Sequence, residues 1–204
     1  MVNAVGMREE GLNRLQQSAL PMVLIDRKIP DFACDVVGLD NTQAATTATE
    51  HLVEKGFEAL LFLSEPLGSV NTRRERLSAF RATLQRYAGI VAENAEVPLN
   101  DGAMLDTVLR QFHSRHRGMR KALISANGAL TLQVARALKR IDLVWGSDIG
   151  LLGFDELEWA ELAAWVLPRS NSPRGRLAMP RLSRWCAGLK ALTTPSASGS
   201  SPVN

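Results

Sequence analysis

Short apolar segments alternate with amphipathic segments along most of the chain between residues 20 and 160. Five runs rich in Leu, Ile and Val have the length of β-strands and end in polar or turn residues, namely 22–26, 59–66, 94–99, 121–127 and 148–155. Runs that are apolar on both faces are typical of buried parallel strands. The pattern therefore predicts a parallel sheet at the centre of the molecule.

Between these runs, apolar residues recur at helical spacing. A helix is predicted from Asn41 to Lys55, with a capping signal before it and Gly56 at its end. Three more are predicted over 72–87, after Asp101 and after Asn127. A repeated order of strand and helix predicts an α/β fold, with parallel sheets and helices on both faces. Ligands of such folds bind beyond the carboxyl ends of the strands.

Polar side chains stand at those strand ends. Asp26, Asn127 and Asp155 each end or follow an apolar run, and Arg76 lies one turn into the helix after the second run. Carboxylates and amides exchange hydrogen bonds with hydroxyl groups, and a guanidinium binds a carboxylate in bidentate fashion. The combination predicts a cleft for a polyhydroxylated or acidic small molecule.

Each of these residues also has a purely structural interpretation. Asn127 and Asp155 can cap the helices that they precede, and capping is compatible with ligand binding. Asp26 can be a turn residue, and Arg76 can be a solvated arginine in the basic segment RRER at 73–76.

Composition narrows the classes of function. The 204 residues carry a net charge of +3, yet no acidic residue follows Glu161, so the excess of positive charge is concentrated after that position. No apolar run approaches the roughly 20 residues needed to cross a bilayer, and no membrane contact is expected. Cys34 and Cys186 lack a paired spacing, as expected in a reducing cytoplasm.

The sequence carries no motif for catalysis, cofactor binding or metal binding. His113 and His116 have a spacing that can bind a metal, but no third ligand is evident and their flanks are strongly charged, which favours a solvated face. No serine lies in a nucleophile-elbow motif, and the glycines at 146, 150 and 153 do not form a dinucleotide fingerprint. We expect neither an enzyme nor a cofactor or metal.

Two blocks of sequence resemble the effector-binding core of LacI/GalR transcription regulators. The block DNTQAATTATEHLVEKGFEALLFLSEPLGSVNTRRERLSAF at 40–80 carries the D-N start, the E-H-L-x-x-x-G helix end and the R-x-x-x-F motif. The block ALISANGALTLQVARALKRIDLVWGSDIGLLGFDELEWAEL at 122–162 carries the A-N helix entry and the D-I-x-x-x-G-F-D strand. The segments GFDELEW and LFLSEPLG look closest to the branch that regulates gluconate or ketogluconate use.

The resemblance implies a type I periplasmic-binding-protein-like fold with two lobes. It assigns residues 1–37 to a remnant of the N-terminal lobe and 38–162 to a mostly complete C-terminal lobe. The first lobe is then fragmentary, and Val23, Leu24 and Ile25 are expected to lack strand neighbours. Residues 163–204 depart from the family pattern and are expected to be an aberrant, disordered basic tail rather than a nucleic-acid-binding segment.

The resemblance also implies which residues contact an effector. By their match to family motifs these are Asp26, Arg76, Asn127 and Asp155, with Thr72 as a further polar contact. The implied ligand is a sugar or sugar acid, with gluconate and 2-ketogluconate among the possibilities.

As a function, the resemblance implies the effector-sensing domain of a cytoplasmic, homodimeric repressor. DNA would be bound only through a helix-turn-helix, which the sequence does not show. The alternative is a periplasmic sugar-binding protein of a transporter, which shares the fold. A fragment of an α/β enzyme is a third reading, without a motif to support it.

Overall fold

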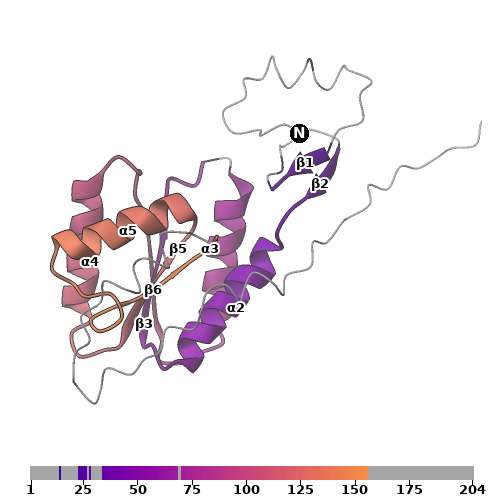
Figure 1. The fold of residues 1–204 in the computed structure, drawn as a ribbon. Helices are drawn as coiled ribbons and strands as arrows, with labels where there is room; N and C mark the ends of the chain where they lie inside the picture. Colours follow the sequence, from indigo (N-terminus) through magenta and orange to yellow (C-terminus); the bar gives the residue numbers. More distant parts are fainter. Residues whose placement is uncertain (1–13, 15–22, 27, 29–33, 69, 156–204) are drawn as a thin grey trace, which may run out of the picture.

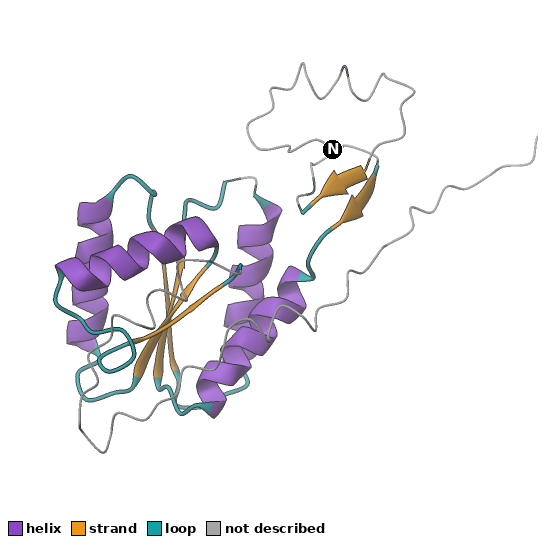
Figure 2. Ribbon diagram, viewed as in Figure 1, coloured by secondary structure: helices purple, strands orange, loops and turns teal. Residues whose placement is uncertain are grey.

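A computed structural model describes residues 14, 23–26, 28, 34–68 and 70–155, and the basic tail over 163–204 lies outside the described residues. Strands and helices alternate along the described chain (Figures 1 and 2). In order they are β1 (Val23–Ile25), β2 (Asp35–Val37), α2 (Asn41–Glu54), β3 (Ala59–Ser64), α3 (Asn71–Leu84), β4 (Val91–Glu96), α4 (Gly102–Arg115), β5 (Lys121–Ser125), α5 (Gly128–Arg140) and β6 (Gly150–Gly153).

The larger of two sheets has the strand order β4-β3-β5-β6, and all of its strands are parallel. Leu61 of β3, for example, pairs with Glu93 on one side and Leu123 on the other. Every residue of β3 and β5 is buried, as the two-sided apolar runs predict. The α/β fold with parallel strands is therefore confirmed.

Helices cover both faces of this sheet (Figure 2). On one face, α4 and α5 pack over the sheet through a core that includes Leu109, Phe112 and Val134. On the other face, α2 and α3 form a core that includes Leu52 and Phe80. Successive β-strand side chains point to opposite faces, so β3 supplies Leu61 and Leu63 to the first core and Leu60 and Phe62 to the second.

The predicted helix starts are confirmed by side-chain caps. Asp40, Asp101 and Asn127 accept hydrogen bonds from backbone N–H groups in the first turns of α2, α4 and α5. After α2, Gly56 has φ +77°, a left-handed conformation that suits glycine at a helix end. These caps fix the helix starts at the carboxyl edge of the large sheet.

Two expectations about strands were wrong. The run predicted over 94–99 forms a strand three residues earlier, at Val91–Glu96, where residues alternate between partly buried and exposed. The strand lies at the edge of the sheet, and Pro98 cannot donate to a ladder, so the apolar run did not mark its bounds.

The second wrong expectation concerns the first lobe. Leu24 does have strand neighbours, because β1 pairs in parallel with β2, which had no sequence signal, and the Leu24 side chain is buried. Val23 and Ile25 remain about half exposed, at 49% and 48%. In the described part of the chain, no helix has both the length and the apolar character to cross a membrane.

Candidate functional site

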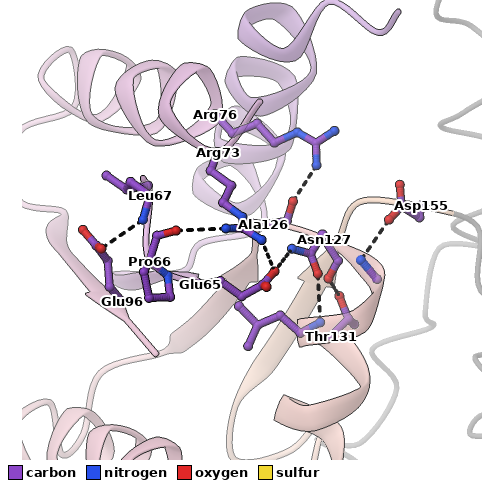
Figure 3. Close-up of polar contacts among 12 residues, drawn as sticks. Glu65, Pro66, Leu67, Arg73, Arg76, Glu96, Ala126, Asn127, Thr131 and Asp155 are labelled. Carbon is purple, nitrogen blue, oxygen red and sulfur yellow. Dashed lines mark hydrogen bonds and ion pairs between the residues drawn. The ribbon is translucent and has the colours of Figure 1, made fainter. Parts of the chain in front are cut away.

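The candidate site lies at the carboxyl edge of the large sheet (Figure 3). Strands β3, β5 and β6 end side by side, and Glu65, Asn127 and Asp155 stand at or just beyond those ends. The sheet order therefore brings residues from three distant parts of the sequence to one edge, as expected for parallel strands.

Arg76 lies in the second turn of α3 and is buried, with 5% of its surface exposed. Its Nε donates to Oδ1 of Asn41 over 2.8 Å, and its Nη1 donates to the carbonyl oxygen of Ala126 (Figure 3). Its guanidinium also stacks over the Phe154 ring, 4.2 Å from the ring centre. The interpretation as a solvated arginine is wrong, because Arg76 is buried and joins the start of α2 to the residues that directly follow β5 and β6.

Asn127 joins α5 to the loop after β3. Its Oδ1 accepts from the N–H of Leu130, while its Nδ2 donates to Oε2 of Glu65 over 2.6 Å. The same Glu65 oxygen pairs with Arg73 at 2.7 Å, and Arg73 also donates to the carbonyl of Pro66. The loop after β3 is thus held by charge-assisted bonds on both sides of Glu65 (Figure 3).

Asp155 reaches back from the end of β6 to the start of α5. Its Oδ2 accepts from the N–H of Gly128 over 2.8 Å, so Asp155 and Asn127 both satisfy backbone donors at the positive end of this helix. Asp155 also has φ +81°, a left-handed conformation uncommon outside glycine. Asn127 caps the helix that it precedes, whereas Asp155 binds the first N–H of α5, and the segment that Asp155 precedes lies outside the described residues. Contact of either residue with a ligand stays a prediction.

Thr72 and Asp26 are placed differently. Thr72 is buried in the first turn of α3, four residues before Arg76. Asp26 follows β1 in the small sheet with φ +69°, and its N–H donates to Val37. Lys28, two residues further along the chain, contacts the start of α3, because its N–H donates to Oδ1 of Asn71 over 3.2 Å.

Sequence reasoning missed four polar residues of this region: Asn41, Glu65, Arg73 and Glu75. Glu65 had a signal, because it directly follows an apolar run. Asn41, Arg73 and Glu75 are helical positions, and most of their partners lie 34 or more residues away or in the loop before α3, where a one-dimensional pattern does not show them. The exception is the pair of Asn71 and Glu75, which are four residues apart on α3. Within the described residues, no group of three or more His, Cys, Asp or Glu side chains is arranged to hold a metal ion.

Comparisons with known proteins agree on one family. Residues 49–167 match the model of the periplasmic binding protein-like domain. The chain is 29% identical to the HTH-type transcriptional regulator KdgR of Bacillus subtilis over 93% of its own length and 57% of that protein. It is 35% identical to the HTH-type transcriptional regulator PtxS of Pseudomonas putida, over 88% of its own length and 51% of that protein.

A solved structure shares the fold. A sugar-binding transcriptional regulator of the LacI family from Enterococcus faecalis superposes with a TM-score of 0.57 at 26% identity, over 71% of this chain and 52% of that one. The chain spans about half the length of the curated relatives it matches, at 57% and 51% of the two proteins above.

Proposed function

Because this chain belongs to the LacI-type family of periplasmic-binding-protein-like domains, we propose that it senses a small effector for a transcriptional repressor. Residues 38–162 correspond to the C-terminal lobe of the sensing core, and 1–37 to a remnant of the N-terminal lobe. DNA contact is assigned to a helix-turn-helix of the kind named in the two relatives. The working unit is a cytoplasmic homodimer.

The observation that carries the proposal is the convergence of Arg76, Asn127 and Asp155 at adjoining strand ends. Arg76 and Asn127 lie beside Ala126 and Glu65, and Asp155 meets the first residue of the same helix, α5. Together they offer one cationic, one amide and one carboxylate group at a single edge of the sheet. Asp26 and Thr72 complete the proposed set of contacts.

The chemistry of this set favours a sugar or a sugar acid. Carboxylate and carboxamide groups bind hydroxyls through paired donor and acceptor atoms, and a guanidinium binds a carboxylate. Arg76 is held within the protein by Asn41 and Phe154, so its charge is already oriented before a ligand arrives. Gluconate and 2-ketogluconate carry both hydroxyls and a carboxylate, and they are the first ligands to test.

The mechanism follows from the position of the site beside the small sheet. A ligand that binds one arrangement of the two lobes more tightly than another shifts the population toward that arrangement. In the intact regulator this shift changes operator affinity, and such coupling typically amounts to about 1–3 kcal/mol. Asp26, which follows β1, is the proposed contact from the first lobe.

Calorimetric titration with D-gluconate, 2-keto-D-gluconate and D-ribose tests the proposal. We expect Arg76→Ala to weaken binding of a sugar acid by about 2–5 kcal/mol, because a buried pairing of guanidinium and carboxylate is lost. Arg74→Ala is the matched control, since Arg74 is an exposed arginine on the same helix. Arg76→Lys keeps a positive charge in the same buried place. Comparing its folding with that of Arg76→Ala separates a loss of ligand contact from a loss of the fold.

Unchanged affinity in a folded Arg76 variant, with the same ligand bound by the parent chain, contradicts the assignment of Arg76. The second candidate function is the sugar-binding protein of a transporter. It shares the fold, but KdgR and PtxS are both named as transcriptional regulators. Measured turnover of these ligands would instead favour an enzyme.

A further inference from the structure

Glu75 lies on α3, next to Arg76, and accepts hydrogen bonds from two asparagines. Its Oε2 accepts from Nδ2 of Asn41 over 2.9 Å, and its Oε1 accepts from Nδ2 of Asn71 over 3.2 Å. Asn41 is the first residue of α2 and is buried, with 3% of its surface exposed, while Asn71 is the first residue of α3. The carboxylate therefore joins the starts of two neighbouring helices.

Both asparagines use their other side-chain atom as well. Oδ1 of Asn41 accepts from Nε of Arg76, and Oδ1 of Asn71 accepts from the backbone N–H of Lys28. A guanidinium and a backbone N–H are donors only, and an ionised carboxylate is an acceptor only. Each carboxamide thus has one orientation that satisfies both of its neighbours.

We propose that Glu75 is a positioning residue that orients Asn41 and Asn71 and thereby connects Lys28, which follows β1, to Arg76, the proposed ligand contact. The contacts run from Lys28 to Asn71, from Asn71 to Glu75, and from Glu75 through Asn41 to Arg76. The effect of Glu75 on ligand binding rests on the proposed function, whereas its effect on the orientation of the two carboxamides does not.

The position of these contacts gives them a role in lobe movement. Lys28 follows β1 of the small sheet, and Asn41 is where the chain enters the large-sheet layers after β2 (Figure 1). A movement of the small sheet that separates Lys28 from Asn71 removes one of the two partners of the Asn71 carboxamide, while Glu75 still accepts from its Nδ2. Because rotation would place Oδ1 of Asn71 against the Glu75 carboxylate, Glu75 keeps Oδ1 in the orientation that receives the Lys28 N–H and so favours the arrangement in which the two are in contact.

A carboxylate is needed because Glu75 must accept twice. Glutamine at this position has one acceptor and one donor, so it satisfies one asparagine and opposes the other. Rotating the opposed carboxamide breaks its bond to Lys28 or to Arg76. Glu75→Gln is therefore expected to release one end of the contacts although the side chain keeps its size.

The double variant Asn71→Asp with Glu75→Gln restores the pattern. One oxygen of the aspartate accepts from the Lys28 N–H, and the other accepts from the glutamine Nε2. The glutamine Oε1 then accepts from Asn41, and the total charge is unchanged. Asn71→Asp alone places two carboxylates against each other and is expected to break the contact.

The experiment measures hydrogen exchange by NMR in the full chain, at the Lys28 backbone N–H and at the side-chain Nδ2 protons of Asn41. We expect Glu75→Gln to raise the exchange rate about tenfold at one of these sites, as for the loss of one part-buried hydrogen bond. The double variant should return both rates to within about twofold of the parent. Glu50→Gln is the matched control, because Glu50 pairs with the exposed Arg86.

Titration with D-gluconate and 2-keto-D-gluconate provides the second readout, in which Glu75→Gln weakens binding and the double variant restores it. If the parent chain binds neither ligand, the proposed ligand class is wrong, but the exchange rates still decide the role of Glu75. Unchanged exchange at both sites in Glu75→Gln, or no rescue in the double variant, overturns the proposal. If Glu75→Gln does not fold, Asn71→Asp, which keeps an acceptor for the Lys28 N–H but opposes Glu75, must raise exchange at Lys28 for the proposal to stand.

Discussion

The two sheets of this chain are both parallel, but they differ in what covers them. All six residues of β3 are at most 1% exposed, because α4 and α5 pack on one face and α2 and α3 on the other. In the small sheet, β1 has only Leu24 buried, and Val23 and Ile25 are about half exposed. The same type of apolar run thus reaches two different degrees of burial.

The difference shows that an apolar run predicts a strand but does not predict how far other elements bury it. A two-stranded sheet is marginally stable in water unless helices or further strands cover it. The large-sheet layers, residues 41–155, contain two cores of their own, whereas the small sheet pairs three residues with three. Stability should therefore depend on the large sheet far more than on the small one.

The largest effect on stability is expected from a substitution in the core of the large sheet. Phe62→Ala should lower the free energy of unfolding by about 3–5 kcal/mol, because Phe62 is 1% exposed and packs against Phe80 with ring centres 5.4 Å apart. Val23→Ala in β1 should change it by about 0.5 kcal/mol or less. Urea unfolding followed by circular dichroism measures both. Equal losses would mean that the small sheet is as well covered as the large one.

A smaller effect is expected where β6 passes close to α5. A Cβ atom on Gly153 would lie 2.5 Å from Oγ1 of Thr131 and 3.3 Å from Oγ of Ser125, both of which are buried. Gly153→Ala should therefore cost about 1–3 kcal/mol through overpacking. Gly102→Ala is the control, since its Cβ would meet only the Arg140 side chain, at 3.4 Å. A neutral Gly153→Ala in thermal unfolding would contradict this close packing.

The pH dependence of stability should be smaller than either effect and should also belong to the large-sheet layers. Burial lowers the pKa of His113, Lys121 lowers it further, Asp148 acts in the opposite direction, and Arg117 again lowers it. As the pH falls through about 6.5, the ordinary pKa of histidine, the unfolded chain therefore takes up a proton before the folded chain does. Stability is expected to fall as the pH drops through this range.

His113→Gln should reduce that slope between pH 7.5 and 5.5, measured by urea unfolding at each pH. The pKa of His51 is also lowered, by burial and by Lys55 against the opposing effect of Glu54, so His51→Gln should remove a further part. Both residues lie on helices of the large sheet. If stability still falls as strongly with pH in the variant that carries both substitutions, other groups must cause the pH dependence. That result would contradict its assignment to the helices of the large sheet.

Local signals predicted most of the large sheet. The caps at Asp40, Asp101 and Asn127 and the two-sided apolar runs determine structure over a few residues, and they were confirmed. The edge strand β4 was misplaced because its exposed side lacks the apolar pattern of a central strand. β2 was missed because three residues that pair with β1 carry no signal of their own.

The candidate site was predicted in part. The strand-end rule identified Asn127 and Asp155, and the structure places both at the start of α5. The contacts that hold Arg76 were not predictable, because Asn41 lies 35 residues and Ala126 lies 50 residues from it in sequence. Such pairings are set by the order of strands in the sheet, which residue spacing does not encode.

The left-handed backbone at Asp26 and Asp155 limits how this protein can be re-engineered. Both positions have φ values that β-branched side chains avoid, and aspartate, asparagine and glycine tolerate them. In a saturation library, these two positions should accept few replacements whatever ligand is selected. A search for altered specificity would gain more from Glu65 and Thr72, where the backbone has no such restriction.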